Sequence, residues 1–140
     1  SRHVLDIGTG SGVLAIASVL LGANTVTAVE RDIDALTNAR QNINRNGVST
    51  RIRTIHTELS ELQDFQFPTP DIILANLTGA AFQKHQHLFE TLGGPSGLLM
   101  ISGLTESEEQ TTLMAFESKF AFESRHEEDG WICLVFRYHC

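Results

Sequence analysis

The stretch Leu5–Ala17, LDIGTGSGVLAIA, places glycines at three alternate positions between a short apolar run and a longer one. A glycine inside a regular element costs about 0.5–1 kcal/mol relative to alanine. A favourable interaction must offset this cost, and the close approach of a ligand to bare backbone is such an interaction. We therefore expect Gly8, Gly10 and Gly12 to form a turn whose backbone N–H groups meet a ligand directly.

The regions around this turn alternate between strand and helix patterns. Strands are expected at residues 3–7, 25–30, 51–56, 71–76 and 98–102. Helices are expected at 11–21, 82–92 and 106–119, with a further helix that Asp32 caps and Asn46-Gly47 ends. The strand at 71–76 is apolar almost throughout, which is typical of a centre strand covered on both faces.

Residues 120–139 form a different pattern, in which two strand-like runs are joined by Asp129-Gly130. This dipeptide is a hairpin signal. Five strands that alternate with helices, followed by a hairpin, predict an α/β fold. We expect an open, mostly parallel Rossmann-like sheet with helices on both faces and a C-terminal antiparallel hairpin.

Length and charge limit the possible functions. The chain has 140 residues, which suits one domain over 1–140, and a formal net charge of −7. No cluster of Lys and Arg exceeds two neighbours, which argues against direct nucleic-acid binding. No apolar stretch is long enough for a membrane span. The two cysteines, Cys133 and Cys140, make no disulfide framework, so a reducing, cytoplasmic setting is expected.

In a fold of this class the ligand lies at the carboxyl ends of the strands. Those ends carry Asp6, Glu30, residues 56–58 and Asn76. Glu30 stands where these folds place a carboxylate that binds a ribose diol, although a merely solvated strand end is the alternative. The ligand is therefore expected to contain a nucleoside.

The glycine spacing narrows the choice of nucleoside. A dinucleotide fingerprint reads G-x-G-x-x-G, whereas this turn reads G-x-G-x-G and is preceded by Asp6. A carboxylate here would repel a pyrophosphate and attract an ammonium or sulfonium group. S-adenosylmethionine carries both groups, so we expect it as cofactor and regard an NAD-dependent dehydrogenase as remote. Asp6 can also cap the loop by accepting backbone N–H bonds.

Two long stretches, VLDIGTGSGVLAIASVLLGA (4–23) and VTAVERDIDALTNARQNINRNGV (26–48), are similar to the catalytic domain of class I methyltransferases. DIILANLTGAAF (71–82), GGPSGLLMISGLTESEEQ (93–110) and GWICLVFR (130–137) resemble the PrmA family in particular. That family methylates the stalk-base protein L-eleven of the large ribosomal subunit. The resemblance implies an S-adenosylmethionine-dependent methyltransferase that acts on a protein amine, a lysine or an α-amino group, in a protein substrate of the ribosomal type.

The resemblance also implies the site residues. Cofactor contacts are expected at Asp6, Gly8, Thr9, Gly10, Gly12, Glu30, Arg31, Glu58 and Asn76. Asn76 is the expected catalytic residue, because its side-chain oxygen can accept the hydrogens of a neutral amine. Asn76 could instead be the N-cap of a following helix, and Glu58 could be a surface acid. Trp131 is expected to pack, with a substrate-edge role as the alternative, and no metal site is expected.

Members of this family carry an N-terminal recognition domain and a segment before the first strand that covers the cofactor. This sequence starts at the first strand. We therefore expect the 140-residue chain alone to bind the cofactor weakly and to methylate poorly. A methyltransferase acting on a small molecule or RNA, and a non-catalytic S-adenosylmethionine-binding module, are alternatives that the sequence leaves open. The sequence does not predict the oligomeric state.

Overall fold

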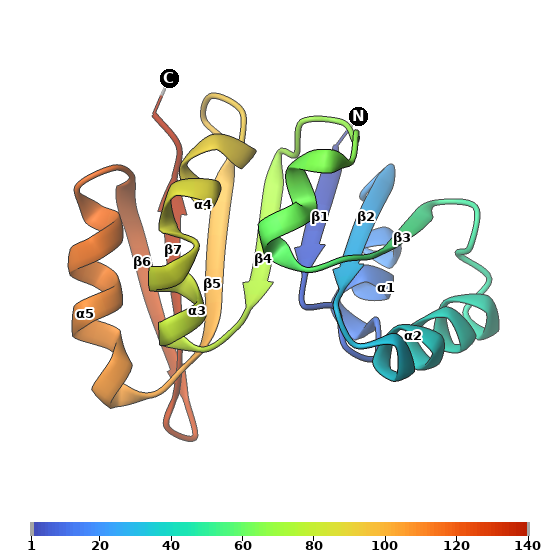
Figure 1. The fold of residues 1–140 in the computed structure, drawn as a ribbon, viewed down its shortest axis with the longest axis horizontal. Helices are drawn as coiled ribbons and strands as arrows, with labels where there is room; N and C mark the ends of the chain where they lie inside the picture. Colours follow the sequence, from blue (N-terminus) through green and yellow to red (C-terminus); the bar gives the residue numbers. More distant parts are fainter. Residues whose placement is uncertain (1, 140) are drawn as a thin grey trace. The chain divides into compact units, whose positions relative to one another are not determined.

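The structure is a computed structural model that describes residues 2–139. These residues form two compact units, divided between Pro70 and Asp71 (Figure 1). Within the described residues, no helix has the length and apolar character needed to cross a membrane.

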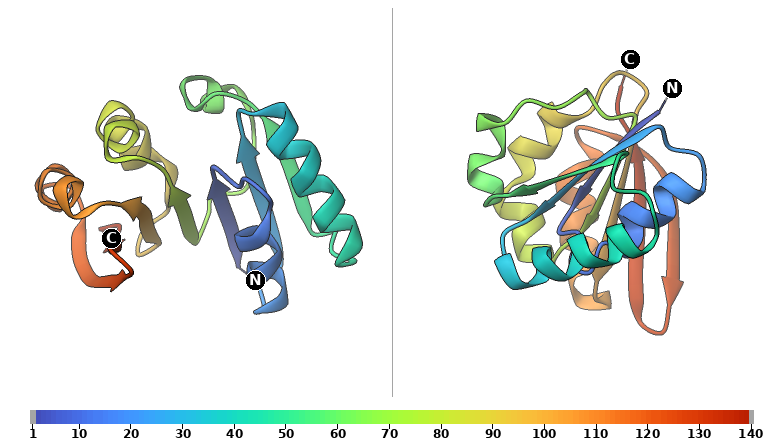
Figure 2. Two further views of the ribbon diagram at one scale, coloured as in Figure 1. Left: turned by 90° about the horizontal axis from the view of Figure 1, so that it is seen from below. Right: turned by 90° about the vertical axis from the view of Figure 1, so that its right-hand side faces the viewer.

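The first unit is built on three parallel strands in the order β3-β2-β1. They are β1 (His3–Ile7), β2 (Thr25–Glu30) and β3 (Ile52–His56). The helices are α1 (Val13–Leu20), α2 (Ile33–Arg45) and a 3-10 helix, η1 (Leu59–Asp64), which the sequence analysis did not predict (Figure 2). The register pairs Asp6 with Ala28 and Glu30 with His56, so the ends of all three strands lie together.

The long helix of this unit forms as its sequence predicts. The Asp32 side chain accepts hydrogen bonds from the backbone N–H groups of Asp34 and Ala35, and this caps α2. Leu36, Ala39 and Ile43 recur at helical spacing and are buried. Residues 46 and 47 end the helix, with Gly47 in the left-handed region at φ 68°.

The second unit has four strands in the order β4-β5-β7-β6. They are β4 (Ile72–Asn76), β5 (Leu98–Leu104), β6 (Ala121–Glu128) and β7 (Trp131–Arg137). β4 and β5 are parallel, whereas β7 runs antiparallel to both β5 and β6. Asp129 and Gly130 both have positive φ, at 53° and 81°, which confirms the predicted hairpin turn.

The core of the second unit is aromatic. Its helices are α3 (Gly79–Lys84), α4 (Gln86–Leu92) and α5 (Glu106–Glu117). Phe82, Phe89 and Phe116 are fully buried, with ring centroids 5.6–6.3 Å apart. Phe116 also contacts Phe136 of β7 at 5.8 Å. These rings pack the three helices against the strands. Aromatic pairs of this kind stabilise the fold beyond the contribution of their buried apolar area.

The structure corrects the prediction of one helix over 82–92. Two helices occupy this region, and the chain breaks between them at His85, with φ −108° and ψ 17°. The first helix begins early because the Thr78 side chain accepts a hydrogen bond from the Ala81 N–H and caps it.

Burial in the strands also differs from prediction. In β4, Ile73 and Ala75 are buried, but Ile72 and Leu74 are only half-buried. Ile73 and Ala75 pair with the buried Leu99 and Ile101 of β5, whereas the apolar residues of the other face are half-buried, so β4 is not fully covered on both faces.

Two side chains of β7 also depart from the predicted packing. Trp131 is 59% exposed rather than packed, and Cys133 is half-buried rather than in the core. In the alternation of β7, Ile132 and Leu134 take the buried positions, which leaves Trp131 and Cys133 on the other face. Burial raises the pKa of the Cys133 thiol. Cys140 lies outside the described residues.

Candidate functional site

The glycine turn connects the end of β1 to the start of α1. Gly8, Gly10 and Gly12 all have positive φ, at 74°, 56° and 83°, so residues with a side chain would be strained there. The N–H groups of Gly8 and Thr9 both donate to the Val29 carbonyl, at 2.9 and 3.0 Å. The Gly12 N–H donates to the Thr9 carbonyl.

The Gly10 N–H donates to Oε1 of Glu30 at 3.0 Å. All four N–H groups thus have partners within the chain. The expectation that they are available to meet a ligand directly is wrong for this structure. What the turn offers a ligand is the open backbone surface at Gly10.

The glycines serve two different purposes. A Cβ built on Gly10 would have a single neighbour within 4 Å, the Gly8 carbonyl oxygen at 4.0 Å, so it would project into open space. A Cβ on Gly12 would lie 3.3 Å from the Cβ of Ala39 on α2. Gly12 therefore allows the turn to pack against α2, whereas Gly10 keeps the outer surface of the turn open.

Asp6 is the buried charge of this region, with 1% of its surface exposed. Its Oδ2 accepts a hydrogen bond from the Thr9 hydroxyl at 2.7 Å, whereas its Oδ1 is buried and has no hydrogen-bond partner. The Ala15 N–H lowers the pKa of Asp6 without making a hydrogen bond of good geometry to Oδ1. Burial is the larger effect and raises this pKa to about 6. A buried carboxylate oxygen without a partner fits a cationic donor supplied by a ligand.

Glu30 lies at the end of β2 and is half-buried. Its Oε1 accepts from Gly10, and its Oε2 accepts from the backbone N–H groups of Arg31 and Asp32, each at 3.0 Å. These bonds fix the carboxylate in one orientation. Because each carboxylate oxygen has two lone pairs, Oε1 retains capacity for a hydroxyl donor.

The Arg31 side chain is exposed, and the residue participates in the loop through its backbone. Its carbonyl accepts a hydrogen bond from Nε2 of His56 at 2.9 Å. On the other side of the turn, the Asn42 amide of α2 donates to the Ser11 carbonyl at 2.9 Å. These long-range contacts of His56 and Asn42 were not predicted, because no local motif in the sequence marks them.

Glu58 follows β3 and is exposed at the N-cap position of η1, where its side chain makes no capping bond. The preceding residue, Thr57, donates its N–H to the Glu30 carbonyl at 3.1 Å, so Glu58 is near the same strand ends. Its contact with the cofactor remains a prediction.

Asn76 belongs to the second unit, where it ends β4 opposite Ser102 of β5. Its side chain is exposed. The alternative role as a helix N-cap is wrong, because Thr78 caps α3. The Asn76 Oδ1 lies against the backbone of Gly103, and a Cβ on Gly103 would be only 2.3 Å from it.

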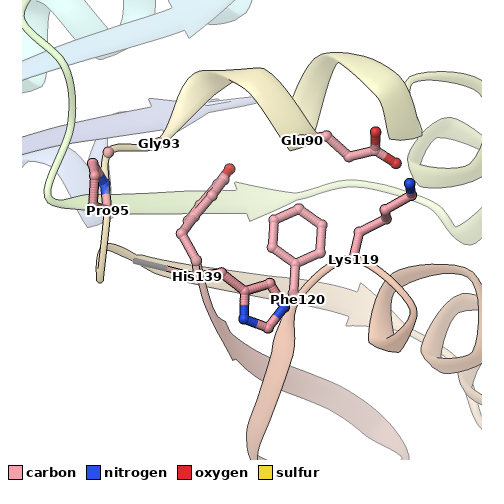
Figure 3. A pocket seen from close by; sticks show the side chains of 8 residues that line it. Glu90, Gly93, Pro95, Lys119, Phe120 and His139 are labelled. Atoms are coloured by element: carbon pink, nitrogen blue, oxygen red, sulfur yellow. The ribbon is translucent and has the colours of Figure 1, made fainter.

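The second unit also contains a hollow of about 320 Å³ between the loop before β5 and the end of β7 (Figure 3). Phe120 and Tyr138 form apolar walls, and Figure 3 shows Glu90 and Lys119 at one side of it. It lies at the opposite end of β5 from Asn76, so it contains none of the candidate residues. Over residues 2–139, no group of three or more His, Cys, Asp and Glu side chains is arranged to hold a metal ion.

Comparison with known proteins connects this geometry to a family. The family model described as "Ribosomal protein L11 methyltransferase (PrmA)" matches residues 1–139. The chain belongs to the PrmA family. The resemblance found in the sequence is therefore confirmed, and so is the assignment to a family of S-adenosylmethionine-dependent methyltransferases.

Individual relatives agree with this assignment. The chain is 34% identical over 133 residues to the ribosomal protein L11 methyltransferase of Tolumonas auensis, covering 95% of this chain and 44% of that protein. It is 36% identical over 135 residues to the corresponding protein of Geobacter sp. strain M21, covering 96% and 42%. The chain thus spans less than half the length of the curated relatives it matches.

Solved structures confirm the fold. The ribosomal protein L11 methylase of Lactobacillus delbrueckii subsp. bulgaricus superposes with a TM-score of 0.88 at 26% identity, covering 99% of this chain and 71% of that one. An RNA methyltransferase from Salinibacter ruber, in complex with S-adenosyl-L-homocysteine, gives 0.76 at 16% identity, covering 99% and 81%. The predicted class I methyltransferase fold, mostly parallel with a C-terminal antiparallel hairpin, is confirmed.

Proposed function

We propose that this chain binds S-adenosylmethionine and transfers its methyl group to an amine of a ribosomal protein. The observation that carries the proposal is the buried Asp6 beside the glycine turn, with one carboxylate oxygen lacking a partner. A pyrophosphate would be repelled by this oxygen, whereas the ammonium of a bound amino acid would satisfy it. Membership of the PrmA family supports the same cofactor.

The residues of the first unit suit the parts of this cofactor. Asp6 would take the ammonium group, and Glu30 would accept hydrogen bonds from the ribose hydroxyls. The open surface at Gly10 would admit the ligand close to the backbone, while the Thr9 hydroxyl keeps its hydrogen bond to Asp6. Glu58, exposed after β3, would face the adenine amino group, and Arg31 would line the loop with its backbone.

When bound, S-adenosylmethionine supplies a methyl group on a sulfonium, which is already a good leaving group. The protein therefore needs mainly to position the acceptor and to exclude water. The Asn76 side-chain oxygen accepts hydrogens from a neutral amine and directs its lone pair. A guanidinium acceptor would need paired carboxylates. The residues directly after β4 are Leu77, Thr78 and Gly79, and none of these three carries a carboxylate. An amine is therefore the better acceptor than a guanidinium.

The substrate class follows from the family and from charge. Relatives over 30% identical are named ribosomal protein L11 methyltransferases. The net charge of −7 favours association with a basic protein over a nucleic acid. A ribosomal protein substrate would place the reaction in the cytoplasm.

Calorimetry with S-adenosylhomocysteine and with NAD tests the cofactor. We expect saturable binding of S-adenosylhomocysteine and none of NAD, and the reverse would overturn the proposal. Transfer of a labelled methyl group from S-adenosylmethionine to ribosomal protein L11 tests the reaction. Labelling of an RNA or a small molecule in place of the protein would point to another substrate class.

A further inference from the structure

The loop that follows Asn76 is held at its far end by a residue of α5. The Gly79 N–H donates to Glu108 Oε2 at 2.7 Å. Glu108 Oε1 accepts from the Thr105 N–H at 3.0 Å and from the Thr105 hydroxyl at 2.8 Å. One carboxylate therefore satisfies backbone donors at the start of both α3 and α5.

Glu108 is itself well fixed. Thr105 and Glu108 form a reciprocal capping box at the start of α5. Hydrogen bonds from Thr105 and Gly79 hold the pKa of Glu108 below its usual range, so the group stays ionised and remains an acceptor. A Cβ on Gly79 would lie 2.8 Å from Glu108 Oε2 and 2.9 Å from its Cβ. Residue 79 must therefore be a glycine for the carboxylate to approach.

The near end of the same loop is held by the end of β5. The Leu77 N–H donates to the Ser102 carbonyl at 3.2 Å. The next residue, Gly103, has φ +87° and lies where the pairing of β5 with β7 shifts register. A Cβ at residue 103 would lie 2.3 Å from the Asn76 Oδ1. The absence of a side chain at Gly103 therefore allows the Asn76 oxygen to pack against the backbone of β5.

We propose that Glu108 and Gly103 are positioning residues for Asn76, an inference that rests on the proposed role of Asn76 toward the acceptor amine. Glu108 fixes the loop from Asn76 to Gly79 by its hydrogen bond to Gly79, and Gly103 leaves the space that the Asn76 oxygen occupies. Neither residue touches the reacting atoms in this proposal.

Glu108→Gln separates the two functions of this carboxylate. Glutamine can serve in a capping box, so it keeps the bonds to Thr105. Its NH₂ group would then face the Gly79 N–H, and two donors cannot bond to each other. We expect kcat for methyl transfer to ribosomal protein L11 to fall about tenfold, with KM and the affinity for S-adenosylhomocysteine unchanged. Glu106→Gln, on the same first turn and exposed, is the matched control and should change none of these.

A double-mutant cycle tests whether the effect passes through Asn76. In the Asn76→Ala background, Glu108→Gln should cause no further loss of kcat. Gly103→Ala should also lower kcat in the native chain and not in the Asn76→Ala background. The backbone strain of Gly103→Ala lowers the stability of the fold in both backgrounds. A melting curve of each variant measures this loss of stability separately from the loss of kcat.

A nuclear magnetic resonance measurement provides a readout that does not depend on turnover. Glu108→Gln should speed hydrogen exchange at the Gly79 amide and shift the side-chain amide resonances of Asn76, whereas Glu106→Gln should do neither. Unshifted Asn76 resonances, or losses of kcat that add fully in the double variants, would overturn the positioning role. If Asn76→Ala itself leaves turnover unchanged, the proposed function of Asn76 fails. The resonances still show whether Glu108 fixes the position of the Asn76 side chain.

Discussion

Gly10 and Glu30, 20 residues apart, are joined by a hydrogen bond of 3.0 Å from the Gly10 N–H to the Glu30 Oε1. This bond couples the glycine turn after β1 to the carboxylate at the end of β2. The residue proposed to bind the ribose is therefore also the residue that fixes the turn. The same carboxylate serves the loop after β2 through its other oxygen.

Glu30→Ala should weaken the binding of S-adenosylhomocysteine by about 1–3 kcal/mol, the scale for losing hydrogen bonds to a charged group. Part of the loss comes from the ribose and part from the unsupported turn. Calorimetry measures it, with Glu61→Ala on η1 as an exposed acidic control. Equal affinities for the two variants would remove Glu30 from the cofactor site.

Alanine substitutions at two glycines should have different consequences. Both Gly10→Ala and Gly12→Ala place a side chain at positive φ, at a cost of roughly 1 kcal/mol in stability. Gly12→Ala also crowds Ala39, so it should lower the melting temperature more. Gly10→Ala should instead mainly abolish binding of S-adenosylhomocysteine, because its Cβ occupies the open face of the turn. Thermal melts and calorimetry on both variants check this, and an identical pattern for the two would contradict it.

The raised pKa of Asp6 predicts a pH dependence of stability. Its pKa is 3.8 for a free side chain and about 6 in the fold, so folding disfavours the charged form. The contribution of Asp6 to stability is therefore complete below pH 3.8 and is lost as the pH rises to about 6. A shift of this size corresponds to about 3 kcal/mol. Asp6→Asn should remove this pH dependence, which denaturant unfolding between pH 4 and 7, at roughly half-unit steps, would measure.

Cofactor binding should act on Asp6 in the opposite direction. A ligand ammonium beside the buried carboxylate favours the charged form and lowers its pKa. Binding near pH 6 should therefore release protons, which calorimetry detects in buffers of different ionisation enthalpy. The Asp6→Asn variant should release none and bind weakly. Proton uptake by the native chain would show that the cation does not contact Asp6.

Asn76→Ala should lower kcat for methyl transfer roughly 100-fold, the scale for losing the orientation of a reacting group. Affinity for S-adenosylhomocysteine should remain close to that of the native chain, because the interaction is made with the acceptor in the transition state. Asn44→Ala, an exposed asparagine on α2, is the control. Unchanged turnover in Asn76→Ala would leave the residue with a structural role only.

Much of the fold could be predicted from the sequence because its determinants are local. The capping of α2 by Asp32 involves residues two and three positions away. The hairpin turn needs only Asp129 and Gly130 with positive φ. The candidate residues at the ends of β1 and β2 were found for a similar reason, since a strand–turn–helix pattern shows where a parallel strand ends.

Other features were decided only by the tertiary structure, because they depend on residues far apart in the chain. The N–H groups of Gly8, Thr9 and Gly10 have partners at Val29 and Glu30, which no local pattern shows. Burial, rather than residue type, raises the pKa of Asp6 and leaves its Oδ1 without a partner. The Thr105–Glu108 capping pattern could be read from the sequence, but its contact with Gly79, 29 residues away, could not. Sequence patterns determined which residues turn and cap, whereas packing determined which polar groups were satisfied and which remained available to a ligand.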